Sequence, residues 1–164
     1  MRTARLAALA AFLVLPAIAS AQSATVTATA TVVTPLVVTG TAGLAFGNVF
    51  QSVNKTVLFS DATSGRFSIS GFGISQVAMT FTLPATLASG ANTLPIDTYD
   101  IRSNGTNVTA GATALTVTSG VPVNANLVGG NLFLFVGGRV LPAAAQAQGA
   151  YTGNIVLAAA YTGL

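Results

Sequence analysis

The sequence contains no cysteine, histidine, glutamate or tryptophan among its 164 residues. Without cysteine no disulfide can staple an exported domain, so packing and hydrogen bonding must hold the fold together. Without histidine or cysteine, the common nucleophile–base pairs of hydrolases cannot form, and zinc sites with nitrogen or sulfur ligands are excluded. We therefore predict a protein that is not an enzyme and that uses no cofactor or metal.

The N-terminus has the features of an export signal. Two arginines precede an apolar run from Leu6 to Ala19, and the small residues Ala19-Ser20-Ala21 supply a cleavage pattern. A membrane anchor needs about 20 apolar residues, whereas this run is shorter and contains Pro16. We predict that residues 1–21 are a signal peptide and that residues 22–164 form one domain. The mature protein is then exported to the periplasm, the cell surface or the extracellular space, without a membrane span.

Charge is scarce, at 5% of residues against 52% hydrophobic residues. Beyond the predicted signal the charged residues are Lys55, Asp61, Arg66, Asp97, Asp100, Arg102 and Arg139. Four scattered cations cannot form the basic stripe that phosphate binding needs, so nucleic acid is excluded as a partner. A surface with so little charge favours self-association.

Short segments rich in threonine, valine and aromatic residues, separated by glycine, asparagine and proline, predict an all-β fold. The predicted strands are Thr25–Val33, Leu36–Thr39, Lys55–Ser60, Arg66–Ser70, Gln76–Leu83, Thr98–Ser103, Ala114–Thr118, Asn131–Val136 and Thr152–Tyr161. Turns are predicted at Asn104-Gly105, at Gly129-Gly130-Asn131 and at Gly137-Gly138, and a loop at 143–147. Such spacing is typical of a sandwich or a barrel.

Two segments carry the clearest patterns. In VAMTFTLP, residues 77–84, Val77, Met79 and Phe81 share one face and threonines lie on the other. In NLFLFVGG, residues 131–138, both faces are apolar, which predicts a central strand covered on both sides.

The remaining candidates for a ligand site are weak. Asp97, Asp100 and Asn104 lie within eight residues of each other, but a calcium loop gathers more carboxylates at closer spacing, so we expect these residues to solvate a strand edge or to pair with Arg102. The glycines of Gly43–Val49 lack the lysine of a phosphate-binding loop. We expect a turn there, with Leu44 and Phe46 in the core.

The alternating run TATATVV, within Thr25–Val33, admits two interpretations. It is either the first strand of its own domain or a strand donated to a neighbouring subunit, with Val26, Ala28, Ala30 and Val32 as the inserting face. Two alanines bury little area, which favours the domain's own strand. The run occurs once, so a stacked ice-binding ladder is not expected.

The order of several motifs resembles a family of exported bacterial domains of unknown function. They are TATATVV, Pro35, LAFGNV, FSISG, MTFTLP and AQAQGAYTGNIVLAAAY, and they extend from about Thr25 to Tyr161. That family is similar in turn to spore coat protein U domains and to pilins of the archaic chaperone–usher pathway. The resemblance implies an immunoglobulin-like, pilin-like antiparallel β-sandwich with a structural role in surface filaments or coats, and neighbouring pilin-like subunits as partners.

Taken together, these features predict a structural or adhesive protein of the bacterial cell surface. One alternative is a small outer-membrane β-barrel, although the sequence lacks the aromatic girdles of that class. Another is a carbohydrate-binding surface module, for which Tyr99 and Tyr151 are the candidate aromatic residues.

Overall fold

The computed structural model describes residues 22–163, so the predicted signal peptide, residues 1–21, lies outside the described residues. The chain divides into two units, residues 1–31 and residues 32–164. In the first unit, residues 22–31 have no secondary structure and are exposed throughout.

The predicted strand Thr25–Val33 is wrong for this structure, because residues 22–36 contain no strand. The side chains of Val26 and Val32 are each 94% exposed. The alternation of side chains fits a strand, but a strand also needs a partner for its backbone groups. The pattern cannot supply that partner, and the domain's own first strand begins at Val37.

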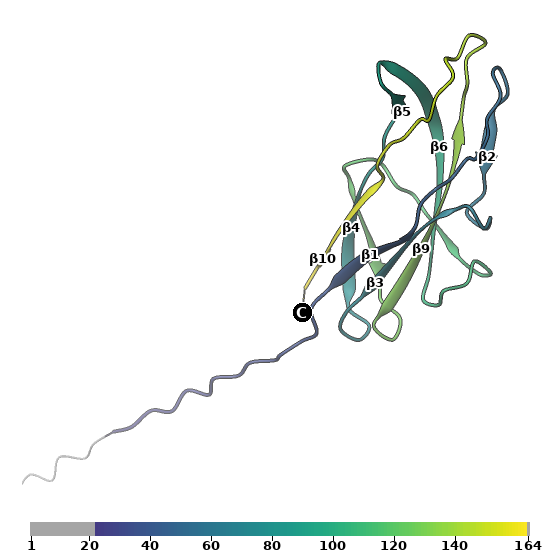
Figure 1. Ribbon diagram of the computed structural model, residues 1–164. Helices are drawn as coiled ribbons and strands as arrows, with labels where there is room; N and C mark the ends of the chain where they lie inside the picture. The colour runs from purple at the N-terminus through teal and green to yellow at the C-terminus, as the bar shows by residue number, and fades with distance from the viewer. Residues whose placement is uncertain (1–21, 164) are drawn as a thin grey trace, which may run out of the picture. The chain divides into compact units, whose positions relative to one another are not determined.

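Residues 22–163 form ten strands and no helix, so the predicted all-β class is confirmed (Figure 1). The strands are β1 (Val37–Ala42), β2 (Lys55–Val57), β3 (Gly65–Ser70), β4 (Gln76–Thr82), β5 (Thr86–Ser89), β6 (Asn92–Asn104), β7 (Thr113–Leu115), β8 (Pro122–Asn126), β9 (Asn131–Val140) and β10 (Val156–Tyr161). With no helix among these residues, none of them belongs to a helical membrane span.

The strands form two antiparallel sheets, an arrangement consistent with a β-sandwich-like fold. The larger sheet has the order β1-β3-β9-β6-β5, with β2 also pairing with β9 and β7 with β6. The smaller sheet has the order β10-β4-β8. β9 lies between β3 and β6, as its two apolar faces predicted.

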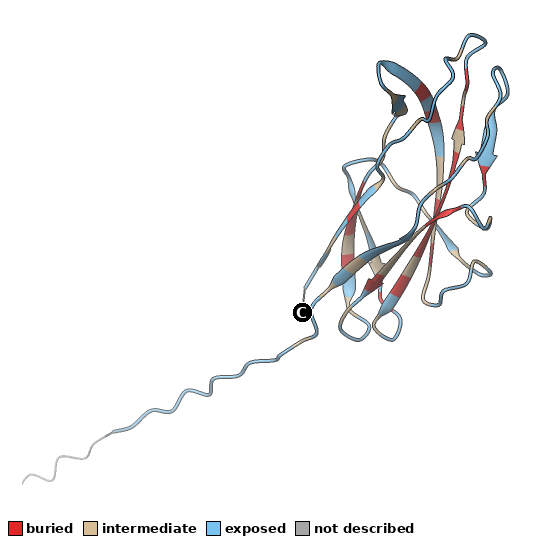
Figure 2. Cartoon of the chain, in the orientation of Figure 1, coloured by how far each residue is buried: buried red, intermediate tan, exposed pale blue. Residues whose placement is uncertain are grey.

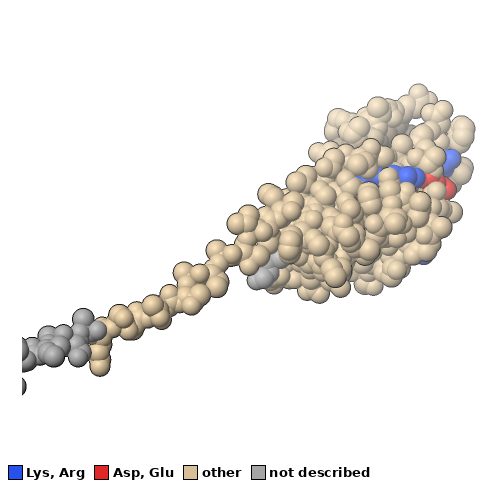
Figure 3. Space-filling model, turned by 90° about the horizontal axis from the view of Figure 1, so that it is seen from below, with Lys and Arg blue, Asp and Glu red and all other residues tan. Residues whose placement is uncertain are grey.

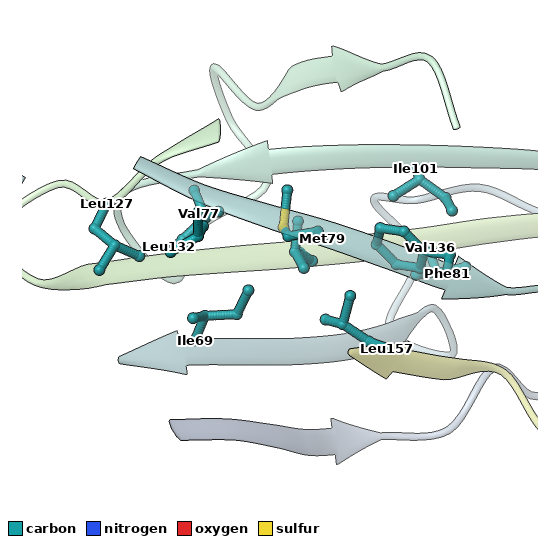
Figure 4. Close-up of a cluster of buried hydrophobic side chains, with 10 residues drawn as sticks. Ile69, Val77, Met79, Phe81, Ile101, Leu127, Leu132, Val136 and Leu157 are labelled. Carbon is teal, nitrogen blue, oxygen red and sulfur yellow. The ribbon is translucent and has the colours of Figure 1, made fainter. Parts of the chain in front are cut away.

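The main core lies between the two sheets, with buried side chains concentrated along β4 and β9 (Figure 2). Val77, Met79 and Phe81 of β4 are fully buried, which confirms the alternation predicted for this strand. Ile69 of β3 and Val136 of β9 belong to the same cluster, drawn in Figure 4. Each such side chain contributes about 1.5–3 kcal/mol through its burial.

A second, smaller core lies on the larger sheet. It consists of Leu94 and Ile96 of β6 and Val140 of β9. Leu44, Phe46 and other half-buried side chains pack against it, which agrees with the expectation that Leu44 and Phe46 turn inward. This second core forms part of the floor of the site described below.

The predicted turn at Gly137-Gly138 is wrong, because both glycines lie inside β9. A Cβ atom at Gly137 would lie 2.7 Å from the backbone nitrogen of Phe59 and 2.7 Å from the carbonyl oxygen of Val57. Glycine is needed here because the chain after β2 crosses closely over β9. The predicted turn at Gly129-Gly130 and the loop at 143–147 are confirmed.

Candidate functional site

The second unit contains a groove with a volume of about 1360 Å³. One wall, residues 40–51, is the end of β1 and the chain that follows it, and the other, residues 146–156, is the chain that leads into β10 and the first residue of that strand. The floor consists of Gly65, Phe67, Pro84, Leu87, Leu94, Ile96, Tyr99 and Pro142. No charged side chain is among the residues that line it.

The first wall is attached to the larger sheet by its apolar side chains. Leu44 lies against two glycines, Gly65 of β3 and Gly138 of β9, where an added Cβ atom would come within 3.3 Å and 3.1 Å of it. Phe46 also approaches Gly138. These close approaches hold the wall against the sheet although residues 43–51 do not form a strand.

The second wall is attached to β5 and to its own loop. Thr152 and Ala88 exchange two backbone hydrogen bonds of 2.9 Å and 2.8 Å. Tyr151 donates a hydrogen bond from its hydroxyl to the carbonyl oxygen of Ala147 and accepts one from Nε2 of Gln146, each 2.7 Å long. The wall is therefore a fixed part of the domain.

The two walls are joined to each other at one end of the groove. Nε2 of Gln51 donates a hydrogen bond of 2.7 Å to the carbonyl oxygen of Gln146. Next to it, the backbone N–H of Ser52 donates to the carbonyl oxygen of Ala143 at 3.4 Å. Toward the other end of this unit, β1 and β10 come together where the two sheets meet (Figure 1).

Residues 43–49 of the first wall and residues 153–155 of the second make almost no backbone hydrogen bonds. In the described chain, the one backbone–backbone hydrogen bond made by residues 43–49 runs from the N–H of Ala45 to the carbonyl of Thr63. None is recorded for residues 153–155 of the opposite wall. Unpaired N–H and C=O groups beside an apolar floor are a template for an additional strand.

Both tyrosines considered as carbohydrate-stacking residues line this groove instead of a flat surface. Tyr99 is half-buried, and its hydroxyl donates a hydrogen bond of 2.7 Å to the carbonyl oxygen of Pro84. Burial raises the pKa of Tyr99 to about 12. Its hydroxyl therefore stays protonated at every physiological pH and serves as a fixed hydrogen-bond donor.

None of the proposed strand-donation residues is among those that line the groove. Val26, Ala28, Ala30 and Val32 are all exposed, and no backbone hydrogen bond of a ladder involves them. Their segment is an uncharged, alternating run without a partner strand, as a strand that fits between the walls would be.

The base of that segment is anchored to the last strand. The hydroxyl of Tyr161 donates a hydrogen bond to the carbonyl oxygen of Thr34 and accepts one of 2.7 Å from the N–H of Phe72. A side chain at Gly71 would collide with this hydroxyl. Sequence reasoning missed this three-part contact because its members are far apart in the chain.

The carboxylates considered as ligands for calcium are paired with arginines. Asp97 accepts two hydrogen bonds from Arg139, and this contact lowers the pKa of Asp97 and raises that of Arg139. Asp100 accepts a bond of 3.1 Å from Arg102, as expected. No group of three potential metal-ligating side chains occurs in the part of the chain that the structure describes.

Charge is also unevenly distributed. Within residues 22–163, the charged side chains lie on strands β2, β3, β6 and β9 or on the connection from β2 to β3, all parts of the larger sheet. On the face seen in Figure 3, they occupy a small area of the folded domain. The smaller sheet, formed by β10, β4 and β8, carries none.

Comparison of the sequence with models of protein families and with curated proteins finds no match. The features of the chain that bear on function are the groove and the unpaired N-terminal segment.

Proposed function

We propose that the protein is an exported structural subunit, with an immunoglobulin-like, pilin-like fold, that joins to copies of itself by strand addition. Residues 25–33 of one copy occupy the groove of the next. The observation that carries this proposal is the combination, in one chain, of a groove with unpaired walls and a strand-like segment without a partner.

The chemistry of the two parts is complementary. The groove offers backbone donors and acceptors and an uncharged floor, and the segment contains no charged residue and no proline up to Val33. Nine residues in extended conformation span about 30 Å. That length matches walls of roughly ten residues each.

The alternation of the segment determines which side faces the floor. With Val26, Ala28, Ala30 and Val32 turned inward, the threonines on the other face remain in water. Because two of the four inward side chains are alanines, most of the affinity comes from main-chain hydrogen bonds, each worth about 0.5–1.5 kcal/mol. The valines contribute burial at the two ends of the run.

Strand addition is tested by substitutions on the two faces of the segment. The chain consisting of residues 22–164 is expected to form a concentration-dependent series of oligomers in size-exclusion chromatography with light scattering. Val26→Asp with Val32→Asp is expected to leave it monomeric, since a charge cannot be buried unpaired in the groove.

The matched control places the same charges on the opposite face of the same segment. Thr27→Asp with Thr31→Asp adds two charges that stay in water, so oligomers are expected to persist. Equal loss of oligomers in both variants would point to general charge repulsion, and a monomeric unsubstituted chain would refute self-assembly by this route.

The surface location is tested in the source organism. An exported subunit of a filament or coat is expected in the fraction released by mechanical shear, without residues 1–21 at its N-terminus. Recovery of the full-length chain from the cell interior would contradict export.

A further inference from the structure

We infer that the copies also contact each other through two exposed apolar patches, which lie on different parts of the domain. The tip patch consists of Phe72, Ile74 and Val128, and the rim patch consists of Phe50 and Val53. The inference rests on the proposed function, because it places the tip patch of a donating copy against the rim patch of the copy that receives its segment.

The tip patch is one surface because its two loops are bonded to each other. The N–H of Gly71 donates to the carbonyl of Gly130 at 2.8 Å, and the N–H of Gly130 donates to the carbonyl of Gly73 at 2.6 Å. Ile74 is 80% exposed, and Phe72 and Val128 are also exposed. An apolar surface of this kind on a secreted domain indicates a contact site.

The tip patch lies at the base of the donated segment. The hydroxyl of Tyr161 bonds both to the N–H of Phe72 and to the carbonyl of Thr34, which immediately follows Val33. If the segment fills a groove as far as Val33, Phe72 of the same copy lies within about 10 Å of that groove. The tether is too short to keep the tip patch away from the receiving copy.

The rim patch is the exposed apolar surface at the joined end of the groove. Phe50 lines the groove and is 73% exposed. The N–H of Val53 bonds to the carbonyl of Phe50, so a turn brings the two side chains close together. Gln51 and Ser52 in the same turn connect the two walls.

The donor must dock at the rim-patch end of the groove, because the opposite end of the groove is already occupied. The end where β1 and β10 converge is the place where the receiving copy anchors its own Thr34. A contact of tip with rim is heterologous, because it uses two different surfaces of the same chain. Repeated, such a contact joins copies head to tail into a chain or a ring. Neither the loops that carry the tip patch nor the Phe50–Val53 turn contain a charge that would oppose it.

The test compares a whole donor with its segment alone. The receiving protein is the chain of residues 22–164 with Val26→Asp and Val32→Asp, which keeps its groove but cannot donate, immobilised on a sensor surface. The two ligands are the synthetic peptide of residues 22–34 and the unsubstituted chain of residues 22–164. We expect the chain to bind at least about tenfold more tightly than the peptide, because it adds the buried apolar patches.

Variants then locate the difference. Phe72→Asn with Ile74→Asn in the donor is expected to reduce its affinity to that of the peptide, and Ile74→Asn alone, at a position that the fold does not bury, is expected to give most of this loss. Val53→Asn in the receiving protein should weaken binding of the donor chain but not of the peptide, because Val53 does not line the groove. The control is Leu58→Asn in the receiving protein. Leu58 is half-exposed and lies outside both patches, so the affinities for the donor chain and for the peptide should both stay unchanged.

The outcomes separate this inference from the proposed function. If the peptide binds but the Ile74→Asn donor binds as tightly as the unsubstituted chain, strand addition stands and the contact between the patches is refuted. If the peptide does not bind, strand addition itself is wrong and this inference fails with it.

Discussion

The hydroxyl of Tyr161, in the last strand, donates a hydrogen bond of 2.9 Å to the carbonyl oxygen of Thr34, which lies 127 residues earlier in the chain. The same oxygen accepts a hydrogen bond from the N–H of Phe72. One side chain therefore holds together the C-terminal strand, the loop after β3 and the point where the N-terminal segment joins the domain.

Tyr161→Phe removes both hydrogen bonds but keeps the ring in the core. We expect the free energy of unfolding to fall by about 1–2 kcal/mol, since the N–H of Phe72 and the carbonyl of Thr34 each lose a partner. Urea denaturation measures this loss, and the amide of Phe72 should exchange its hydrogen faster. Unchanged exchange at Phe72 would contradict the role of the hydroxyl.

Gly137→Ala is expected to destabilise the fold by about 1–3 kcal/mol, because its Cβ atom meets backbone atoms of Val57 and Phe59, which cannot move as a side chain can. Gly43→Ala is the control, since a Cβ atom there meets nothing within 4 Å. Thermal unfolding of both variants measures the difference. Equal melting temperatures would show that the chain after β2 does not cross β9 this closely.

Ser64→Ala is expected to be neutral or to stabilise the fold by up to about 1 kcal/mol. The hydroxyl of Ser64 is buried and has no hydrogen-bond partner among the described residues, so its removal relieves a desolvation cost. Ser119→Ala provides the contrast, because the Ser119 hydroxyl accepts a bond of 2.9 Å from the N–H of Leu83. Chemical denaturation should rank Ser64→Ala above Ser119→Ala, and the reverse order would be contrary to this account.

Tyr99 is expected to make the fold sensitive to alkali. Burial raises its pKa from 10.0 to about 12, so between these values the unfolded chain loses this proton and the folded chain keeps it. Stability should therefore decrease as the pH rises from about 10 to about 12. Tyr99→Phe should lack this contribution. In the folded protein, phenolate absorbance measured against pH should show one tyrosine that titrates late, and this late step should be absent from Tyr99→Phe. If the late step remained in the variant, another tyrosine would be responsible for it.

Strands with a strong side-chain pattern could be predicted from the sequence. β4 has regular alternation, and β9 has two apolar faces that match its position between two neighbours. β5 (TLAS) and β8 (PVNAN) are too short for their side-chain patterns to stand out in the sequence. β5 pairs with the strand that follows it directly, across Gly90-Ala91, whereas β8 pairs with β4, about 50 residues earlier in the chain, and pairing between such distant segments leaves no local signal.

One wall of the groove could be predicted in part from the sequence. Leu44 and Phe46, among glycines, were expected to turn inward, and both are half-buried, as is Val49 after them. They form a wall of a groove only because a second wall lies opposite, about 100 residues later in the chain. Both walls also contain residues that are not hydrogen-bonded into either sheet, and this cannot be predicted from the local sequence. For the N-terminal segment the reverse holds: its strand pattern is clear, but the partner is missing from its own domain.

The absence of charge from the smaller sheet and from the groove determines how association between copies should respond to salt and temperature. Copies that approach through uncharged surfaces are not steered by long-range fields, so their rate of association should be nearly independent of ionic strength. Apolar contacts weaken on cooling. A polymer of this protein would therefore tolerate both dilute and salty surroundings, and temperature would be the condition to which its apolar contacts respond.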